Sequence, residues 1–296
     1  MLHGRQYSAR WLAVIVTVLP AVGAVRASTT NPAGRPGTET TTIAPAGMVR
    51  IPAGSYEPIL RGRDDVARVP VAAFWLDVHP VTNAEYLEFV RTNPKWRRSR
   101  VSLLFADEGY LGDWAGDLEL GAKSPANAPV VRVSWFAAEA YAAWVGKRLP
   151  TTAEWEHAAA AGFTTLRGES EPAYQEAALG WFAQPTPARF PDAGLGRPNL
   201  YGVRDMLTLV WEWVDDFNTA LVTGESRSDT GLDRNLFCGA GAASARDLTN
   251  YPAFMRAGFR SSLRASYVVP NLGFRCARSI SRPAAGKPAP SDHHPL

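Results

Sequence analysis

The feature that most constrains this chain is a run of aromatic residues interspersed with carboxylates, NLYGVRDMLTLVWEW, at Asn199–Trp213. A carboxylate buried among tryptophans is costly unless a cation or several hydrogen-bond donors compensate its charge. Asp205 and Glu212, with carbonyls of the turn between them, suit a hard ion such as calcium, which prefers oxygen ligands in irregular loops. The alternative is a structural strand and turn whose acids are solvated or pair with arginines. Both interpretations remain open at this point.

The two ends of the chain predict where the protein is located. Two arginines precede an apolar run that ends in small residues, so we interpret residues 1–27 as a secretory signal peptide. The run is too short for a typical membrane span, and an uncleaved N-terminal anchor is the alternative. Residues 28–46 are typical of a flexible leader and residues 280–296 of a disordered tail. We therefore expect an exported protein, periplasmic or extracellular, with no membrane span after cleavage.

The charge of the mature chain argues against nucleic-acid partners. The full sequence has 31 basic and 28 acidic residues, and three arginines but no acid leave with the signal peptide. The remaining 28 basic and 28 acidic residues give a net charge of zero. We therefore expect no nucleic-acid or anionic-membrane binding. The basic cluster Lys95–Arg100 is typical of a solvated loop, and residues 47–279 are long enough for one large domain.

Capping patterns predict three helices. Each begins at a hydroxyl residue that can accept from a backbone N–H of the first turn, and two of the three carry the glutamate of a capping box. One helix is expected within Val81–Asn93, and the second is expected to end at Gly146. Short strands among glycine and proline turns account for the remainder, which favours an α+β fold. The caps are Thr82 with Glu85, Ser134, and Thr151 with Glu154.

Five segments resemble, in the right order, the motifs of the formylglycine-generating, sulfatase-modifying-factor family. The segment at Asn199–Trp213 resembles NxYGLxDMxGNVWEW of that family. The resemblance covers roughly residues 47–279 and implies the irregular variant of the C-type lectin fold, which is low in regular secondary structure. The other four segments are MVRIPAGSY (Met48–Tyr56), FWLDVHPVTNAEYLEFV (Phe74–Val90), PVVRVSWFAAEAYAAWVGKRLPTTAEWEHAAAAG (Pro129–Gly162) and NLGFRCA (Asn271–Ala277).

The resemblance also predicts where copper-binding cysteines would lie in this chain. Formylglycine-generating enzymes oxidise a cysteine of a sulfatase with oxygen and a copper ion held by two cysteines, and soft thiolates suit Cu(I). FRSSLR at Phe259–Arg264 resembles the family's YRxxxR segment, and counting back from it places the two cysteine positions near Tyr251 and Arg256. The chain's two cysteines lie elsewhere, at Cys238 and Cys276. In an exported protein such a pair is interpreted first as a disulfide, with free thiols as the alternative. We expect no copper cofactor.

The resemblance supports the calcium interpretation. In the family, one calcium site takes the acid of the YGLxDM segment, two carbonyls of the following turn and the glutamate of WEW. The corresponding ligands are Asp205, the carbonyls of Thr208 and Val210, and Glu212, although Thr208-Leu209 replaces the usual Gly-Asn. Of the histidines, His79 and His157 are expected to be structural, because neither belongs to a metal-ligand spacing.

Two classes of function follow from these patterns. The first is an accessory or maturation protein that binds an exported protein or peptide in a groove, and the chain resembles exported accessory proteins found with copper nitrite reductases. The second is an oxidoreductase of the formylglycine-generating type that acts through Cys238. A lectin-like carbohydrate-binding module rests on fold analogy alone. For the groove, the alternative is that its last two arginines lie on a strand face and pair with acids. The groove residues are Trp211, Tyr251, Arg256, Arg260 and Arg264.

Overall fold

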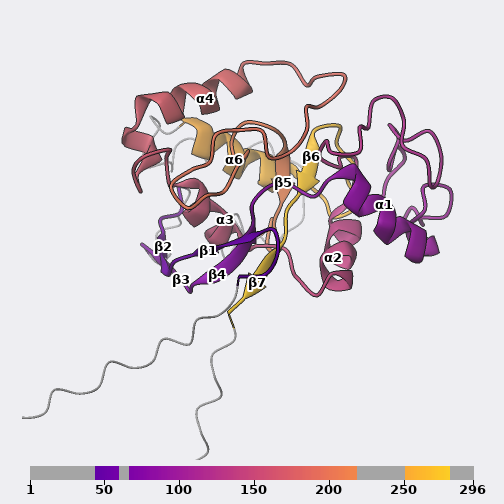
Figure 1. Cartoon of the computed structure of the whole chain (residues 1–296), viewed down its shortest axis with the longest axis horizontal. Coiled ribbons are helices and arrows are strands. Elements are labelled where there is room, and N and C mark those ends of the chain that lie inside the picture. Colours follow the sequence, from indigo (N-terminus) through magenta and orange to yellow (C-terminus); the bar gives the residue numbers. More distant parts are fainter. Residues whose placement is uncertain (1–43, 60–66, 219–250, 281–296) are drawn as a thin grey trace, which may run out of the picture. The chain divides into compact units, whose positions relative to one another are not determined.

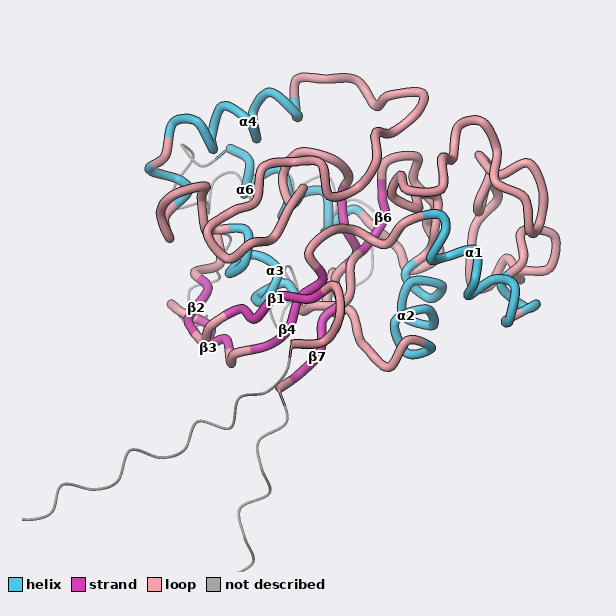
Figure 2. The backbone as a smooth tube through the Cα atoms, viewed as in Figure 1, coloured by secondary structure: helices cyan, strands magenta, loops and turns pink. Residues whose placement is uncertain are grey.

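The computed structural model describes residues 44–59, 67–218 and 251–280 (Figure 1). Long loops connect short helices and strands (Figure 2), which confirms the expected α+β fold. The expected signal peptide, most of the leader and nearly all of the C-terminal tail lie outside the described residues. None of the helices in the described ranges has the length and apolar character that crossing a membrane requires.

The described residues form three small sheets. Strand β4 (Phe74–Asp77) lies between β1 (Met48–Ile51) and β7 (Ala277–Ser279), and both pairings are antiparallel. All four residues of β4 are buried, as expected for a central strand covered on both faces. The other two sheets are an antiparallel pair, β2 (Gly54–Tyr56) with β3 (Val69–Val71), and a parallel pair, β5 (Trp211–Trp213) with β6 (Leu272–Phe274).

The predicted helix starts are confirmed. Helices α1 (Asn83–Thr92) and α3 (Thr152–Ala159) each begin with a complete capping box, in which the cap hydroxyl and the glutamate three residues later satisfy each other's backbone N–H groups. The Ser134 hydroxyl accepts from the N–H of Ala137 at the start of α2 (Trp135–Trp144). Two 3₁₀ turns, Pro94–Trp96 and Gly168–Ser170, and helix α4 (Pro172–Phe182) complete this part of the chain.

Aromatic packing joins the first two helices to the β6 strand. Tyr86 of α1 stacks on Tyr141 of α2 with ring centroids 5.6 Å apart, and the ring of Phe274 meets both edge-on. The buried hydroxyl of Tyr86 is satisfied by the hydroxyl of Tyr110 at 2.8 Å. Such pairs add specific geometry to the area they bury, so the core has one defined packing.

Residues 251–262 form a helix, α6 (Tyr251–Ser262). This corrects the interpretation in which Arg260 lies on the face of a strand. The local sequence favours the helix, because Pro252 falls in the first turn, where its missing N–H costs nothing, and Ala, Met and Arg residues follow. Helix α6 packs against α4, while α3 lies against β2 and β3 (Figure 1).

Candidate functional site

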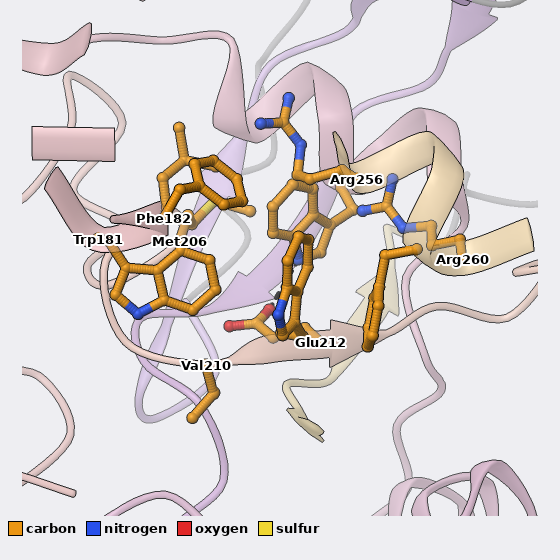
Figure 3. Close-up of a pocket in the computed structure, with 11 residues that line it drawn as sticks. Trp181, Phe182, Met206, Val210, Glu212, Arg256 and Arg260 are labelled. Carbon is orange, nitrogen blue, oxygen red and sulfur yellow. Dashed lines mark hydrogen bonds between the residues drawn. The ribbon is translucent and has the colours of Figure 1, made fainter. Parts of the chain in front are cut away.

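A small pocket forms where α3, α4, β5 and α6 meet. Its free volume is about 10 Å³, which is room for roughly one water molecule. In Figure 3, Trp181 and Phe182 of α4 lie on one side, with Arg256 and Arg260 of α6 on the other. The lining residues are Trp155, Trp181, Phe182, Met206, Leu207, Val210, Trp211, Glu212, Arg256, Phe259 and Arg260.

Half-exposed aromatic side chains form one wall of the pocket. Trp211 stacks on Phe259 with ring centroids 4.3 Å apart, and Trp181 and Phe182 contact Trp211 at 5.2 and 5.4 Å. Tyr251, which is 49% exposed, extends this group through Phe182. Tyr251 is the exposed member of this group, while the other four rings are partly buried, and together they offer a rigid apolar surface for contact.

Two arginines of α6 share one glutamate of α3 on the other side. Arg256 donates from Nε and Nη2 to the two carboxylate oxygens of Glu156 at 2.9 and 2.7 Å, and Arg260 donates from Nη1 at 2.5 Å. The guanidinium carbons of Arg256 and Arg260 lie 5.5 and 4.8 Å from the ring centroid of Trp155. We call Glu156, Arg256 and Arg260 the arginine triad.

The triad holds Glu156 ionised. Burial alone would raise the pKa of Glu156, but the charges and hydrogen bonds of Arg256 and Arg260 outweigh it and lower the pKa to about 2. Two guanidinium groups therefore face one carboxylate, and the triad carries a net charge of +1. The Nη1 group of Arg256 is buried and has no hydrogen-bond partner among the residues that the structure describes.

A second buried glutamate lies across Trp155 from the triad. The indole Nε1 of Trp155 donates to Glu212 at 2.7 Å, and Arg275 donates to both carboxylate oxygens of Glu212 from Nε and Nη2, each at 2.7 Å. Arg275 also donates to three backbone carbonyls, those of Asp77, Val78 and Arg204. The side chains of Glu212 and Arg275 are 0% exposed, so this pair is fully enclosed and balanced in charge.

These contacts decide how the fold compensates the acids around Asn199–Trp213. The carboxylate of Asp205 accepts backbone N–H groups of Gly194 and Gly196, and the carboxylate of Glu212 is taken by Arg275 and Trp155. Among the described residues no group of three or more His, Cys, Asp or Glu side chains is placed to hold a metal ion. The expected calcium site combines only two carboxylates, Asp205 and Glu212, with the carbonyls of Thr208 and Val210, so it stays a prediction. Hydrogen-bond donors from the protein compensate the charges of both buried carboxylates.

The structure brings together three of the five expected groove residues. Trp211, Arg256 and Arg260 line the pocket, and Tyr251 lies beside it. Arg264 does not line it: its side chain is exposed, with the guanidinium carbon 5.7 Å from the ring centroid of Tyr267.

The expected thiol and histidine residues are structural where the structure describes them. Cys276 is a free, fully buried thiol, and burial raises its pKa well above the usual value. A free Cys276 speaks against the expected disulfide, but Cys238 lies outside the described residues, so the pairing stays a prediction. His157 contacts the Pro52 carbonyl at 3.1 Å, and the Nδ1 of His79 contacts the Pro80 carbonyl at 2.9 Å.

Sequence reasoning missed several members of the site. Glu156 lies within the quoted segment Pro129–Gly162, but Glu154 satisfied the capping pattern there and Glu156 received no role. Glu156 and Arg256 are 100 residues apart in the sequence, so no local pattern indicates that they pair. Trp181, Phe182 and Phe259 were also missed, and the only available signal was the high aromatic content of these short segments.

Comparisons with known proteins place these residues in a family context. The model of the sulfatase-modifying factor enzyme 1-like domain family matches residues 33–280. The formylglycine-generating enzyme of Streptomyces coelicolor is 31% identical over 86% of this chain and 96% of its own length. The protein named inactive C-alpha-formylglycine-generating enzyme 2 of Mus musculus is 30% identical, over 80% of this chain and 87% of its own length.

Two further matches are a longer protein and a distant solved structure. A protein named serine/threonine-protein kinase pkn1, from Chlamydia pneumoniae, is 29% identical over 79% of this chain, and the match spans only 38% of the length of that relative. The solved structure of PvdO from Pseudomonas aeruginosa matches 79% of this chain and 94% of its own, with 20% identity and a TM-score of 0.45.

Proposed function

The chain belongs to the sulfatase-modifying factor family, and on this premise we propose that it is an exported accessory protein that binds a protein or peptide partner. In this proposal it does not generate formylglycine with copper. The single observation that carries the proposal is the arginine triad. Arg256 stands where the resemblance places the second copper cysteine, and its guanidinium is bound to Glu156.

The geometry of α6 argues against a copper pair at these positions. A guanidinium has donors only, so it cannot act as a ligand to copper, which would require soft thiolates. Tyr251 and Arg256 are also five residues apart on a continuous helix, which turns their side chains about 140° away from each other around the axis. Tyr251 is exposed, whereas Arg256 is buried. Tyr251 and Arg256 therefore do not supply a ligand pair for copper, and we assign this face of α6 to partner binding instead.

The aromatic wall supports a binding role. The half-exposed rings around Trp211 offer an apolar contact surface, and the small pocket behind them admits only a small group of a bound partner. We propose an exported protein as the partner, because the sequence predicts a signal peptide on this chain.

Site-specific crosslinking tests the binding role. A photoreactive phenylalanine analogue replaces Tyr251 in the full exported chain, and the same analogue replaces Trp144, an exposed aromatic residue of α2, as the matched control. We expect Tyr251 to capture one defined exported protein and Trp144 to capture none. Equal capture from both positions, or none from either, would contradict the proposal.

An oxidoreductase acting through Cys238 is the second candidate. It is favoured by the buried, high-pKa state of the Cys276 thiol, which leaves Cys238 as the cysteine for any thiol chemistry. Incubation with Cu(I), oxygen and a peptide that carries the target cysteine of a sulfatase separates the two candidates. We expect mass spectrometry to detect no aldehyde. Copper-dependent aldehyde formation that Cys238→Ser abolishes would establish the oxidoreductase instead.

A further inference from the structure

The arginine triad leaves a positive charge and a donor without compensation. Glu156 can neutralise only one of its two arginines, and the bidentate contact uses Nε and Nη2 of Arg256. Within residues 44–59, 67–218 and 251–280, the third nitrogen, Nη1, has no hydrogen-bond partner although Arg256 is only 8% exposed. Buried donors are almost always satisfied, and a buried charge without a counter-charge is costly, so this arrangement is incomplete without an anion.

None of the neighbouring titratable groups can supply that anion. Tyr56 and Tyr174 lie close enough to interact with the triad, but burial raises the pKa of each far above neutral pH, so both stay uncharged. The hydroxyl of Tyr174 is already donated to the Ala159 carbonyl at 2.7 Å. Glu212 lines the same pocket, but Arg275 takes both of its carboxylate oxygens. The excess charge thus persists over the whole described surroundings.

The surroundings of the triad limit what the anion can be attached to. Arg256 and Arg260 line the pocket whose opposite wall consists of Trp181, Phe182 and Trp211. The room behind these rings takes about one water-sized group. That space suits a single polar atom such as a carboxylate oxygen, and the partly exposed rings of Trp181 and Phe182 lie opposite the two arginines (Figure 3).

We propose that Arg256 and Arg260 form a carboxylate-binding site, which takes a carboxylate carried next to an apolar or aromatic group, as at the C-terminus of a peptide. The carboxylate accepts from the free Nη1 of Arg256 and balances the triad. This inference rests on the proposed binding function, because it assigns the chemistry of the partner to the same pocket.

Titration calorimetry on the full chain with a matched pair of probes tests the site. N-acetylphenylalanine carries the carboxylate and an aromatic ring, and N-acetylphenylalanine amide has the same shape without the charge. We expect the acid to bind at least about tenfold more tightly than the amide, because a hydrogen bond to a charged group is lost in the amide. Quenching of tryptophan fluorescence should follow the acid, since three tryptophans line the pocket.

Two variants test whether Arg256 is the residue that gives the preference for the acid over the amide. In Arg256→Gln the preference for the acid should fall to about onefold, whereas Arg91→Gln, which removes an exposed arginine that pairs with Glu88 on α1, should leave it unchanged. Equal binding of acid and amide to the unmodified chain would overturn the site whether or not Arg256→Gln folds. Equal displacement by inorganic phosphate would also overturn it, because the site would then be a general oxyanion site.

The outcomes separate this inference from the proposed function. Capture of a partner through Tyr251 with no preference for the acid would leave the binding function standing and remove the carboxylate site. A preference for the acid with no captured partner would leave the site standing and remove the accessory role.

Discussion

Two buried glutamates on either side of Trp155 are compensated in different ways. Glu212 faces one arginine, Arg275, whose remaining hydrogen bonds go to backbone carbonyls, so every charge there is balanced within the fold. Glu156 faces two arginines and leaves a donor of Arg256 unused. The balanced pair ties distant segments together, whereas the unbalanced triad lines the pocket. In the proposed function, the closed pair serves stability, and the triad, which is left one charge short, serves binding.

The largest loss of stability is expected when Arg275 is replaced. Arg275→Met leaves Glu212 buried without its cation and leaves carbonyls such as that of Asp77 without a donor. We expect unfolding in urea to show a loss of about 3–5 kcal/mol in the free energy of unfolding. A loss below about 1 kcal/mol, as for an exposed pair, would show that the enclosed pair is not what holds these segments.

The next effect concerns pH. The folded-state pKa of Glu156 is about 2, below the ordinary value of 4.5, so folding favours the ionised form. Its stabilisation is complete above about pH 4.5 and is lost as the pH falls through about 2, by about 3 kcal/mol in all. Glu156→Gln should remove this acid-dependent step. Chemical unfolding of both proteins between these pH values measures it, and parallel profiles would contradict the assignment.

The smallest effect is expected at Arg256. Arg256→Gln removes one of two cations, but Arg260 still bonds Glu156 and the unpartnered Nη1 disappears. We expect the free energy of unfolding to fall by about 1 kcal/mol or less. The comparison with Arg275→Met, under the same urea conditions, is the sharpest measure of the difference between the two glutamates. Equal losses in the two variants would mean that the triad is as structural as the enclosed pair.

Local signals predicted the helices, because a cap needs only residues within one turn. Thr82 and Thr151 with their glutamates and the Ser134 cap identified three helix starts from the sequence. The α+β class followed from the short strands and turns between these helices, and the ordered motifs of the resemblance implied the irregular C-type lectin architecture.

The site depends on contacts that no local pattern records. Arg260 is 104 residues from Glu156, and Arg275 is 63 residues from Glu212. The sequence showed that the acid at Glu212 needed compensation, but two compensations were chemically possible and only the packing selects the arginine. The aromatic residues of α4 had no motif to mark them, so the wall of the pocket emerged only from the fold.

The contacts of Arg275 also determine at which stage of synthesis the domain can complete its folding. Its guanidinium bonds the carbonyl of Asp77 across 198 residues of chain, and the neighbouring strand β7 completes the sheet on β4. The chain must lose conformational entropy to bring such distant residues together before their contacts can stabilise it. Folding is therefore expected to be slow. In a chain emerging from synthesis, Glu212 has no cation to pair with until Arg275 follows. We therefore expect the domain to complete its folding only with its last strands, and a chain truncated before Leu272 to aggregate rather than form a smaller domain.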